Sequence, residues 1–310
     1  MNLVARLRSG ASAVPAAVGS RRPEALPAGT RLGNARIERP LGRGATSTVY
    51  LASDVDSGLA LAVKVLCPEP GDDTLAASQA FLHQAQVASR LAHPHIVRIL
   101  GGGQVGGIAF LTMEALPGRD LRHYAQRERL LPEPAVLLVC AQAAQALAYA
   151  HRQGVVHRDV KPANIVFDAA TRRTVLTDFG IARAPDAQAT RSGVFLGSPV
   201  YMAPELLAGP PPDARSDLAA RGVTAFELLA GRPPFESASM GVLLRQVSQA
   251  APPPLAALRP DWPADMAQQL DGLLAPVLAK NALDRPADGD AWAAQARQLA
   301  DRLATVATLR

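Results

Sequence analysis

The hydrophobic periodicity changes part of the way along the chain, and this change limits the folds open to it. Alternating apolar residues between glycine-containing turns predict antiparallel strands at 35–41, 48–53, 59–66, 96–100 and 108–113. From residue 131 the spacing becomes helical, with helices expected at 133–152, 216–230, 240–249, 266–278 and 290–304. One helix at 74–91 interrupts the strands, and a hairpin at 164–177 interrupts the helices. A strand-rich third before a helical remainder predicts an α+β fold of two lobes, with a ligand cleft between them.

The composition excludes several classes of protein. With 48% hydrophobic and 19% charged residues, the 310-residue chain can bury a full core. The net charge of +5 comes from scattered arginines without interleaved aromatics, so we expect a basic surface and no nucleic-acid partner. No stretch has about 18 uninterrupted apolar residues, so no membrane span is expected. Cys67 and Cys140 have neither metal-ligand nor redox spacing, which favours a reducing, cytoplasmic location.

We expect one folded domain with a short extension at each end. Residues 1–29 are rich in Arg, Ala and Ser and resemble a transit peptide, but a disordered basic leader is the simpler interpretation. The domain is expected over 30–302, with a smaller lobe at about 30–115 and a larger one at about 116–302. Residues 303–310 are expected to form a tail.

The run HRDVKPAN, residues 157–164, has the clearest chemistry in the chain. Asp159 can accept the proton of an attacking hydroxyl, Lys161 can neutralise a transferring phosphoryl group, and Asn164 can ligate a metal. A polar loop at the end of a helix would not need this spacing. The motif DFG at 178–180 follows a short strand and adds a second metal-binding carboxylate.

Two further motifs are weak signals when taken alone. The segment LGRGATSTV at 41–49 places two glycines between strands, where backbone N–H groups could approach phosphates, although most such pairs are ordinary turns. Lys64 lies inside an apolar strand, where it would either face a phosphate or extend from the strand edge into solvent.

Over roughly residues 30–300, the sequence resembles the protein-kinase superfamily. The resemblance is carried by six features in the expected order: the glycine turn, the strand lysine, HRDVKPAN, DFG, GSPVYMAPE and the distal Arg285. The segments HPHIV and FELLAGRPPF are similar to bacterial eukaryotic-like (Hanks-type) Ser/Thr protein kinases. The resemblance implies a small antiparallel β-sheet lobe with one main helix and a larger, mostly helical lobe. It also implies transfer of the ATP γ-phosphate to Ser or Thr hydroxyls of protein substrates, with Mg²⁺ or Mn²⁺ as cofactor.

The resemblance also assigns roles to individual residues. Asp159 and Lys161 are implied to be catalytic, and Asn164 and Asp178 to hold Mg²⁺. The implied ATP-binding residues are Leu41, Gly42, Arg43, Gly44, Ala45, Thr46, Ser47, Thr48, Val49, Ala62, Lys64, Met113, Glu114, Leu116 and Val166. Structural roles are implied for His157, Arg158, Phe179, Gly180, Glu205, Asp217 and Arg285, with Asp217 bracing the catalytic loop and Glu205 pairing with Arg285.

The main departure from the family is at Gln84, where the helix after the lysine strand usually has a Glu that pairs with that lysine. Gln can accept a hydrogen bond from Lys64 but supplies no charge, and charge-assisted hydrogen bonds are about twice as strong as neutral ones. An active Ser/Thr kinase is therefore favoured, and a pseudokinase-like nucleotide-binding or scaffolding module is the alternative. A smaller departure lies two and three residues after Asp217, where the family usually has an aromatic and a small polar residue and this chain has Ala219 and Ala220, followed by Arg221.

The segment between DFG and GSPVYMAPE predicts a regulatory site. Thr190 and Ser192 are its hydroxyl residues within 184–196, and Arg158 and Arg183 could pair with a phosphate there. We therefore expect autophosphorylation at one of the two, with self-association allowing it to occur in trans. Two exposed polar residues without such a role are the alternative.

Overall fold

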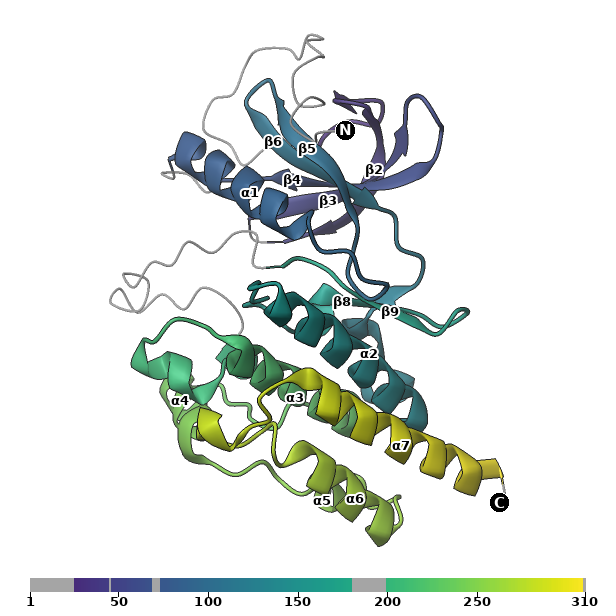
Figure 1. Ribbon diagram of the computed structural model, residues 1–310, viewed down its shortest axis with the longest axis vertical. Coiled ribbons are helices and arrows are strands. Elements are labelled where there is room, and N and C mark those ends of the chain that lie inside the picture. The colour runs from purple at the N-terminus through teal and green to yellow at the C-terminus, as the bar shows by residue number, and fades with distance from the viewer. Residues whose placement is uncertain (1–24, 45, 69–72, 180–198, 309–310) are drawn as a thin grey trace. The chain divides into compact units, whose positions relative to one another are not determined.

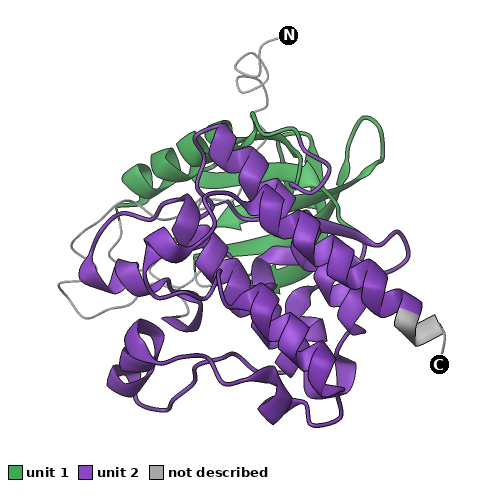
Figure 2. Cartoon of the chain, turned by 60° about the horizontal axis from the view of Figure 1, so that its bottom comes forward, with its two compact units in different colours: residues 1–92, 97–116, 181–184 green, residues 93–96, 117–180, 185–310 purple. Residues whose placement is uncertain are grey.

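The computed structural model describes residues 25–44, 46–68, 73–179 and 199–308, and the chain forms two compact units (Figures 1 and 2). Unit 1 contains the described residues up to Ala92 together with Val97–Leu116. Unit 2 contains His93–Ile96 and the described chain from Pro117 onward.

Unit 1 is built on a six-stranded antiparallel sheet with the strand order β1-β2-β3-β4-β6-β5. Its strands are β1 (Arg31–Leu32), β2 (Ala35–Arg43), β3 (Ser47–Asp54), β4 (Ala60–Leu66), β5 (Ile99–Val105) and β6 (Ile108–Glu114). The helix α1 (Thr74–Ala88) lies against this sheet (Figure 1). Asp73 caps α1 by accepting hydrogen bonds from the N–H groups of Leu75 and Ala76, which would otherwise have no partner at a helix start.

The two faces of the sheet are covered by different parts of unit 1. Side chains alternate along a strand, so Leu61, Val63 and Val65 point to one face, into a cluster with β1, β2 and β3. Leu66 points to the opposite face, where it packs against Phe81 of α1. This alternation puts Lys64 on the face that α1 covers.

Unit 1 includes described residues before residue 30, which is the expected start of the domain. The Leu26 N–H donates to the Tyr50 hydroxyl at 3.0 Å, and the Leu26 side chain packs against the cluster of β1 to β4. Residues 1–24 of the expected leader lie outside the described residues.

Unit 2 is mostly helical, with a small three-stranded sheet of order β7-β8-β9. Its main elements are β7 (Arg119–Asp120), α2 (Glu133–Arg152), β8 (Ile165–Asp168), β9 (Arg173–Leu176), α3 (Ala214–Ala230), α4 (Met240–Gln249), α5 (Leu255–Leu258), α6 (Ala264–Leu274) and α7 (Gly289–Thr308). Short 3-10 turns lie between them, including η4 (Pro162–Asn164), η5 (Pro199–Tyr201), η6 (Pro204–Ala208) and η7 (Ala282–Asp284).

The centre of unit 2 is α2, which lies side by side with α7 and also packs on α3 (Figure 1). Most residues of α2 are buried, including Cys140 at 2% exposed. Among the described helices, α2 is the one long and apolar enough to match a membrane span, and 67% of that apolar window is buried inside the structure. The core helix of a folded domain has the same properties, so α2 is only weak evidence for a span.

Local signals fix both ends of α3. Asp213 and Ser216 form a reciprocal capping box at its start, an arrangement that contributes about 1 kcal/mol. Gly231 ends the helix with a left-handed backbone at φ 76°, which glycine adopts without steric cost.

The predicted fold class is confirmed, and most predicted elements are found within a few residues. The helices at 133–152 and 240–249 have the predicted ends. The strand predicted at 96–100 is instead β5 at Ile99–Val105, and it includes the glycines at 101–103. A Cβ on Gly102 would lie 2.7 Å from a Leu111 side-chain carbon, so this strand needs glycine to pair closely with β6. The helix α7 continues to Thr308 and so includes most of the expected tail.

Candidate active site

The predicted catalytic motif, HRDVKPAN, lies in unit 2, in the loop between α2 and β8. The Lys161 ammonium donates to the Asp159 carboxylate at 2.7 Å. The Asn164 amide donates to the same carboxylate oxygen at 2.9 Å and to the Asp159 carbonyl at 2.8 Å. The side chains of Asp159 and Lys161 are 26% and 25% exposed, so the carboxylate is held from two sides yet still reaches solvent. This arrangement presents a fixed proton acceptor beside a cation.

The backbone of this loop is held by Asp217 of α3. One Asp217 oxygen accepts from the His157 N–H at 2.7 Å, and the other accepts from the Arg158 N–H at 2.8 Å. Arg158 has a left-handed backbone at φ 67°, which is costly for a non-glycine residue. Backbone N–H groups that donate to a buried carboxylate, here 2% exposed, make hydrogen bonds strong enough to maintain that conformation.

A residue without a predicted role, His151, completes this brace. Its Nε2 donates to an Asp217 oxygen at 2.8 Å, which links the last turn of α2 to the carboxylate that holds the loop. His151 is 66 residues before Asp217 and lies in another helix, so sequence spacing does not indicate the contact between them. A histidine in the last turn of a helix is usually only a favourable charge near that helix end.

His157 has a structural position in the site. Its Nδ1 accepts from the Asp159 N–H at 3.3 Å, and its Nε2 donates to the Thr177 carbonyl at 2.9 Å. Burial is the main cause that lowers its pKa, so the imidazole stays neutral. The ring packs against Phe179 with 4.6 Å between centroids. Both ring nitrogens are engaged, so His157 positions the loop and does not exchange protons with a substrate.

The two implied metal ligands come from adjacent positions of unit 2. The Thr177 N–H donates to the Asn164 carbonyl at 2.9 Å, which brings the next residue, Asp178, close to Asn164. Asp178 has a left-handed backbone at φ 58°. An amide oxygen and a carboxylate suit Mg²⁺, which is commonly held by one or two protein oxygens together with substrate phosphates. Within the described part of the chain, no three His, Cys, Asp or Glu residues are grouped as a metal site.

In unit 1, four of the implied ATP-binding side chains share one face of the sheet. Val49 is directly opposite Lys64 in the register of β3 and β4, and Ala62 is opposite Met113 of β6. Opposite residues of an antiparallel pair point to the same face, as do residues two apart in a strand. Val49, Ala62, Lys64 and Met113 are therefore grouped, and Lys64 is only 7% exposed.

The glycine motif forms the hairpin turn between β2 and β3. Gly42 is opposite Val49, Arg43 is opposite Thr48, and the Gly44 N–H donates to the Ser47 carbonyl at 2.8 Å. A Cβ on Gly42 would have no atom within 4 Å, so the space beside this backbone is open. Around the turn, Leu41 is 49% exposed and the Thr46 carbonyl accepts from the Cys67 N–H at 2.8 Å. Ala45 lies outside the described residues.

The remaining ATP-binding positions are divided between the units. Glu114 ends β6, and its N–H donates to the Arg98 carbonyl at 3.0 Å, so that donor is already used. Leu116 is half-buried at the end of unit 1. Val166 belongs to β8 of unit 2. Just before β7, the chain approaches β8 so closely that a Cβ on Gly118 would lie 2.3 Å from the Phe167 carbonyl oxygen.

Gln84 lies on the sheet-facing side of α1. It is three residues after Phe81 and four before Ala88, and both of these are buried. The residue is half-buried itself. The structure thus places Gln84 and Lys64 on the same side of the sheet.

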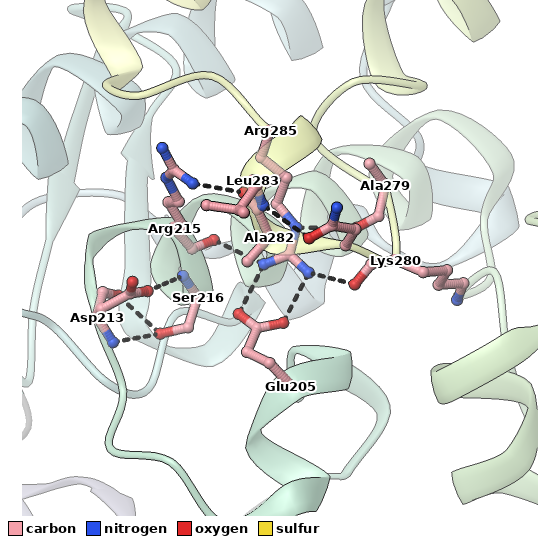
Figure 3. Close-up of polar contacts among 10 residues, drawn as sticks. Glu205, Asp213, Arg215, Ser216, Ala279, Lys280, Ala282, Leu283 and Arg285 are labelled. Atoms are coloured by element: carbon pink, nitrogen blue, oxygen red, sulfur yellow. Dashed lines mark hydrogen bonds and ion pairs between the residues drawn. The ribbon is translucent and has the colours of Figure 1, made fainter.

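Glu205 and Arg285 form a two-pronged ion pair in unit 2, with both N–O distances at 2.7 Å (Figure 3). The Arg285 side chain is fully buried, and it also donates to the carbonyls of Ala279, Lys280 and Arg215. Close by in sequence, the Tyr201 hydroxyl donates to Glu227 of α3 at 2.7 Å, a contact without a sequence prediction. The motif GSPVYMAPE is therefore fixed at two points of its described part.

Gly180, Thr190 and Ser192 lie outside the described residues.

The sequence matches the family model for the protein kinase domain over residues 35–299. It is 37% identical over 264 residues to the serine/threonine-protein kinase PkaA of Streptomyces coelicolor, covering 81% of this chain and 47% of that protein. It is 38% identical over 267 residues to PknJ of Mycobacterium tuberculosis, covering 84% and 44%. It is 36% identical over 270 residues to pkn3 of Myxococcus xanthus, covering 84% and 49%. The chain thus spans just under half the length of these relatives.

The fold also matches a crystal structure of Rad53 residues 1–466 in complex with AMP-PNP. The TM-score is 0.69 at 23% identity, with 86% of this chain and 64% of that one covered. At this identity the match shows the fold alone. With the family model covering nearly the whole described chain, the protein belongs to the protein kinase domain family.

Proposed function

We propose that the chain is an ATP-dependent protein kinase that transfers the γ-phosphate to Ser or Thr hydroxyls of proteins. The observation that carries the proposal is the geometry of Asp159, with Lys161 and Asn164 bound to its side chain and Asp217 holding its loop. The relatives named as Ser/Thr kinases support the choice of hydroxyl substrates.

Each group has a distinct part in the proposed reaction. Asp159 accepts the proton of the attacking Ser or Thr hydroxyl as its oxygen bonds to the γ-phosphorus and the bond to the β-phosphate oxygen breaks. Lys161, 2.7 Å from that carboxylate, stabilises negative charge on the transferring group. Lys64 and the backbone of the glycine turn bind the phosphates of ATP.

The described residues fit a magnesium cofactor at Asn164 and Asp178. Their oxygens are the ligand type that Mg²⁺ prefers, and the 164–177 backbone hydrogen bond holds them near each other. When bound, Mg²⁺ would neutralise the phosphate oxygens and favour departure of ADP. Mn²⁺ accepts the same ligands and is a practical substitute in an assay.

The test is phosphate transfer from labelled ATP to dephosphorylated casein, with Asp159→Asn and Asp159→Ala as controls. The Asn variant keeps the size of the side chain but cannot accept the proton. A general base contributes about 10²–10⁴-fold to a rate, so both variants should lose at least about 100-fold in turnover. Wild type that transfers no more phosphate than Asp159→Ala would contradict the proposal.

We also propose that the chain phosphorylates itself at Thr190 or Ser192. Phosphopeptide mapping of active protein tests this, with the double Ala variant as control. A rate of self-phosphorylation that rises with protein concentration would show that two copies react in trans. Modification elsewhere only would contradict the assignment.

A cytoplasmic location is proposed as well. Both cysteines are free thiols in the structure, and Cys140 is buried, as suits a reducing compartment. Fractionation of cells that express the chain tests this placement.

A further inference from the structure

Lys280 joins two parts of unit 2 through its side chain and its backbone. Its ammonium donates to the Val247 carbonyl at 2.7 Å and to the Gln246 carbonyl at 3.3 Å, both in the last turn of α4. The same ammonium lies 4.0 Å from the centroid of the Phe235 ring. On the other side, the Lys280 carbonyl accepts from the Arg285 guanidinium at 3.3 Å, and the lysine side chain extends away from it (Figure 3).

The helix α4 depends on such outside contacts for its position. It has only ten residues, and Ser239 at its start makes no side-chain capping hydrogen bond. Helices shorter than about 12 residues are marginal on their own, so packing and end contacts decide whether they hold. The carbonyls at a helix end need donors and favour a nearby cation. Lys280 supplies both at the C-terminal end of α4.

The buried side of α4 packs on the described part of GSPVYMAPE and on the turn that continues from it. Leu243 and Val247 of α4 form a cluster with Phe235, and Val200 and Leu207 pack against it. Val200 belongs to η5 and Leu207 to η6. We call residues 199–208, which contain both turns, the shelf. The shelf is thus supported by α4 through apolar contacts and by Arg285 through Glu205.

We propose that Lys280 is a positioning residue for protein substrates, because it fastens α4 to the Arg285–Glu205 pair and so fixes the shelf. The inference rests on the proposed kinase function and on the resemblance to protein kinases, which implies that the GSPVYMAPE segment docks the peptide substrate. It goes further by assigning a substrate-specific effect to a residue that has no role among the implied site residues. Burial is the main cause that lowers the pKa of Lys280 to about 8, with Arg285 as the second cause. The side chain therefore remains largely an ammonium at neutral pH.

The experiment compares Lys280→Met, Lys280→Arg and the matched control Arg245→Met, which removes an exposed cation from α4. Steady-state kinetics are measured with dephosphorylated casein and, separately, with ATP as the varied substrate. We expect Lys280→Met to raise the KM for casein at least threefold while the KM for ATP changes less than twofold. Lys280→Arg keeps the charge and the donors, so its casein KM should be within twofold of wild type. Arg245→Met should resemble wild type.

A second measurement does not depend on activity. Amide hydrogen exchange at 199–208 and 240–250 should be at least fivefold faster in Lys280→Met than in wild type, and near wild type in Lys280→Arg. An unchanged casein KM in an active enzyme would overturn the inference and leave the proposed function intact. Equal changes in both KM values with a lower melting temperature would overturn it as well, since general destabilisation would then explain the effect. If wild type shows no transfer, the proposed function fails, and unchanged exchange in Lys280→Met would separately overturn the role of Lys280.

Discussion

Replacing Arg221 by Met should stabilise the chain, although Arg221 is among its most buried residues. The side chain is 0% exposed, and its three nitrogens have no hydrogen-bond acceptor among the described residues. The guanidinium lies 3.5 Å from the centroid of the Trp292 ring, and burial lowers its pKa to about 10. The guanidinium thus stays charged at neutral pH, and its contact with the Trp292 ring is the main interaction that offsets the cost of burying that charge.

The magnitude follows from two opposing effects. The pKa falls from 12.5 to about 10, and each pKa unit corresponds to about 1.4 kcal/mol, so burial of the charge costs about 3 kcal/mol. A desolvated cation–π contact stabilises the folded state by up to about 2 kcal/mol. Met has a similar unbranched shape and carries no charge. We therefore expect Arg221→Met to raise the free energy of unfolding by about 1–3 kcal/mol, in line with hydrophobic replacement of other buried charges.

Urea unfolding monitored by circular dichroism measures this change. Arg302→Met, at an exposed position of α7, is the matched control and should stay within about 0.5 kcal/mol of wild type. A loss of more than about 1 kcal/mol in Arg221→Met would refute the reasoning, because it would show that the guanidinium has acceptors such as ordered water or an ion.

Three further predictions concern the site and its support. Gln84→Glu should raise turnover several-fold, because a charged hydrogen bond to Lys64 is about twice as strong as a neutral one; unchanged kcat would mean that Lys64 is already held by another group. The free energy of unfolding should fall as the pH drops below about 6.5, because burial lowers the pKa of His157 and the unfolded chain therefore binds that proton first. Urea unfolding at about pH 7.5 and 5.5 measures this change, and the difference between the two pH values should be smaller in His157→Asn. Glu205→Gln should lower the free energy of unfolding by roughly 3 kcal/mol, because it leaves the buried Arg285 without its anion. The control Asp261→Asn, at an exposed ion pair, should lower it by less than about 1 kcal/mol. Equal losses in the two variants would argue against the importance of the Glu205–Arg285 pair.

Sequence reasoning succeeded where a signal was local. The α2 helix has apolar residues at helical spacing after Pro132 and before Gly154, and its predicted ends are found. Asp159, Lys161 and Asn164 lie within six residues, so any turn there brings them together. The face shared by Val49, Ala62 and Lys64 follows from alternation once the strands are paired in register.

Contacts between distant elements could not be read from patterns of this kind. Asp217 is 58 residues from Asp159, and only family resemblance indicated that it reaches the catalytic loop. Lys280 and Arg221 look like ordinary basic residues in sequence. Their importance depends on which carbonyls, rings or apolar walls surround them, and that is decided by tertiary packing.

Two residues at the candidate site have a left-handed backbone conformation that lowers the stability of the fold. Arg158 and Asp178 both have positive φ angles, at 67° and 58°, a conformation that glycine adopts without steric cost and other residues at about 1–2 kcal/mol. Glycine at either position would therefore relax the backbone and remove the side chain. Mutations selected only for thermostability would tend to accumulate at these positions and inactivate the site. A thermostable form of this domain should instead be sought at Arg221, where the gain in stability requires no change to the catalytic loop.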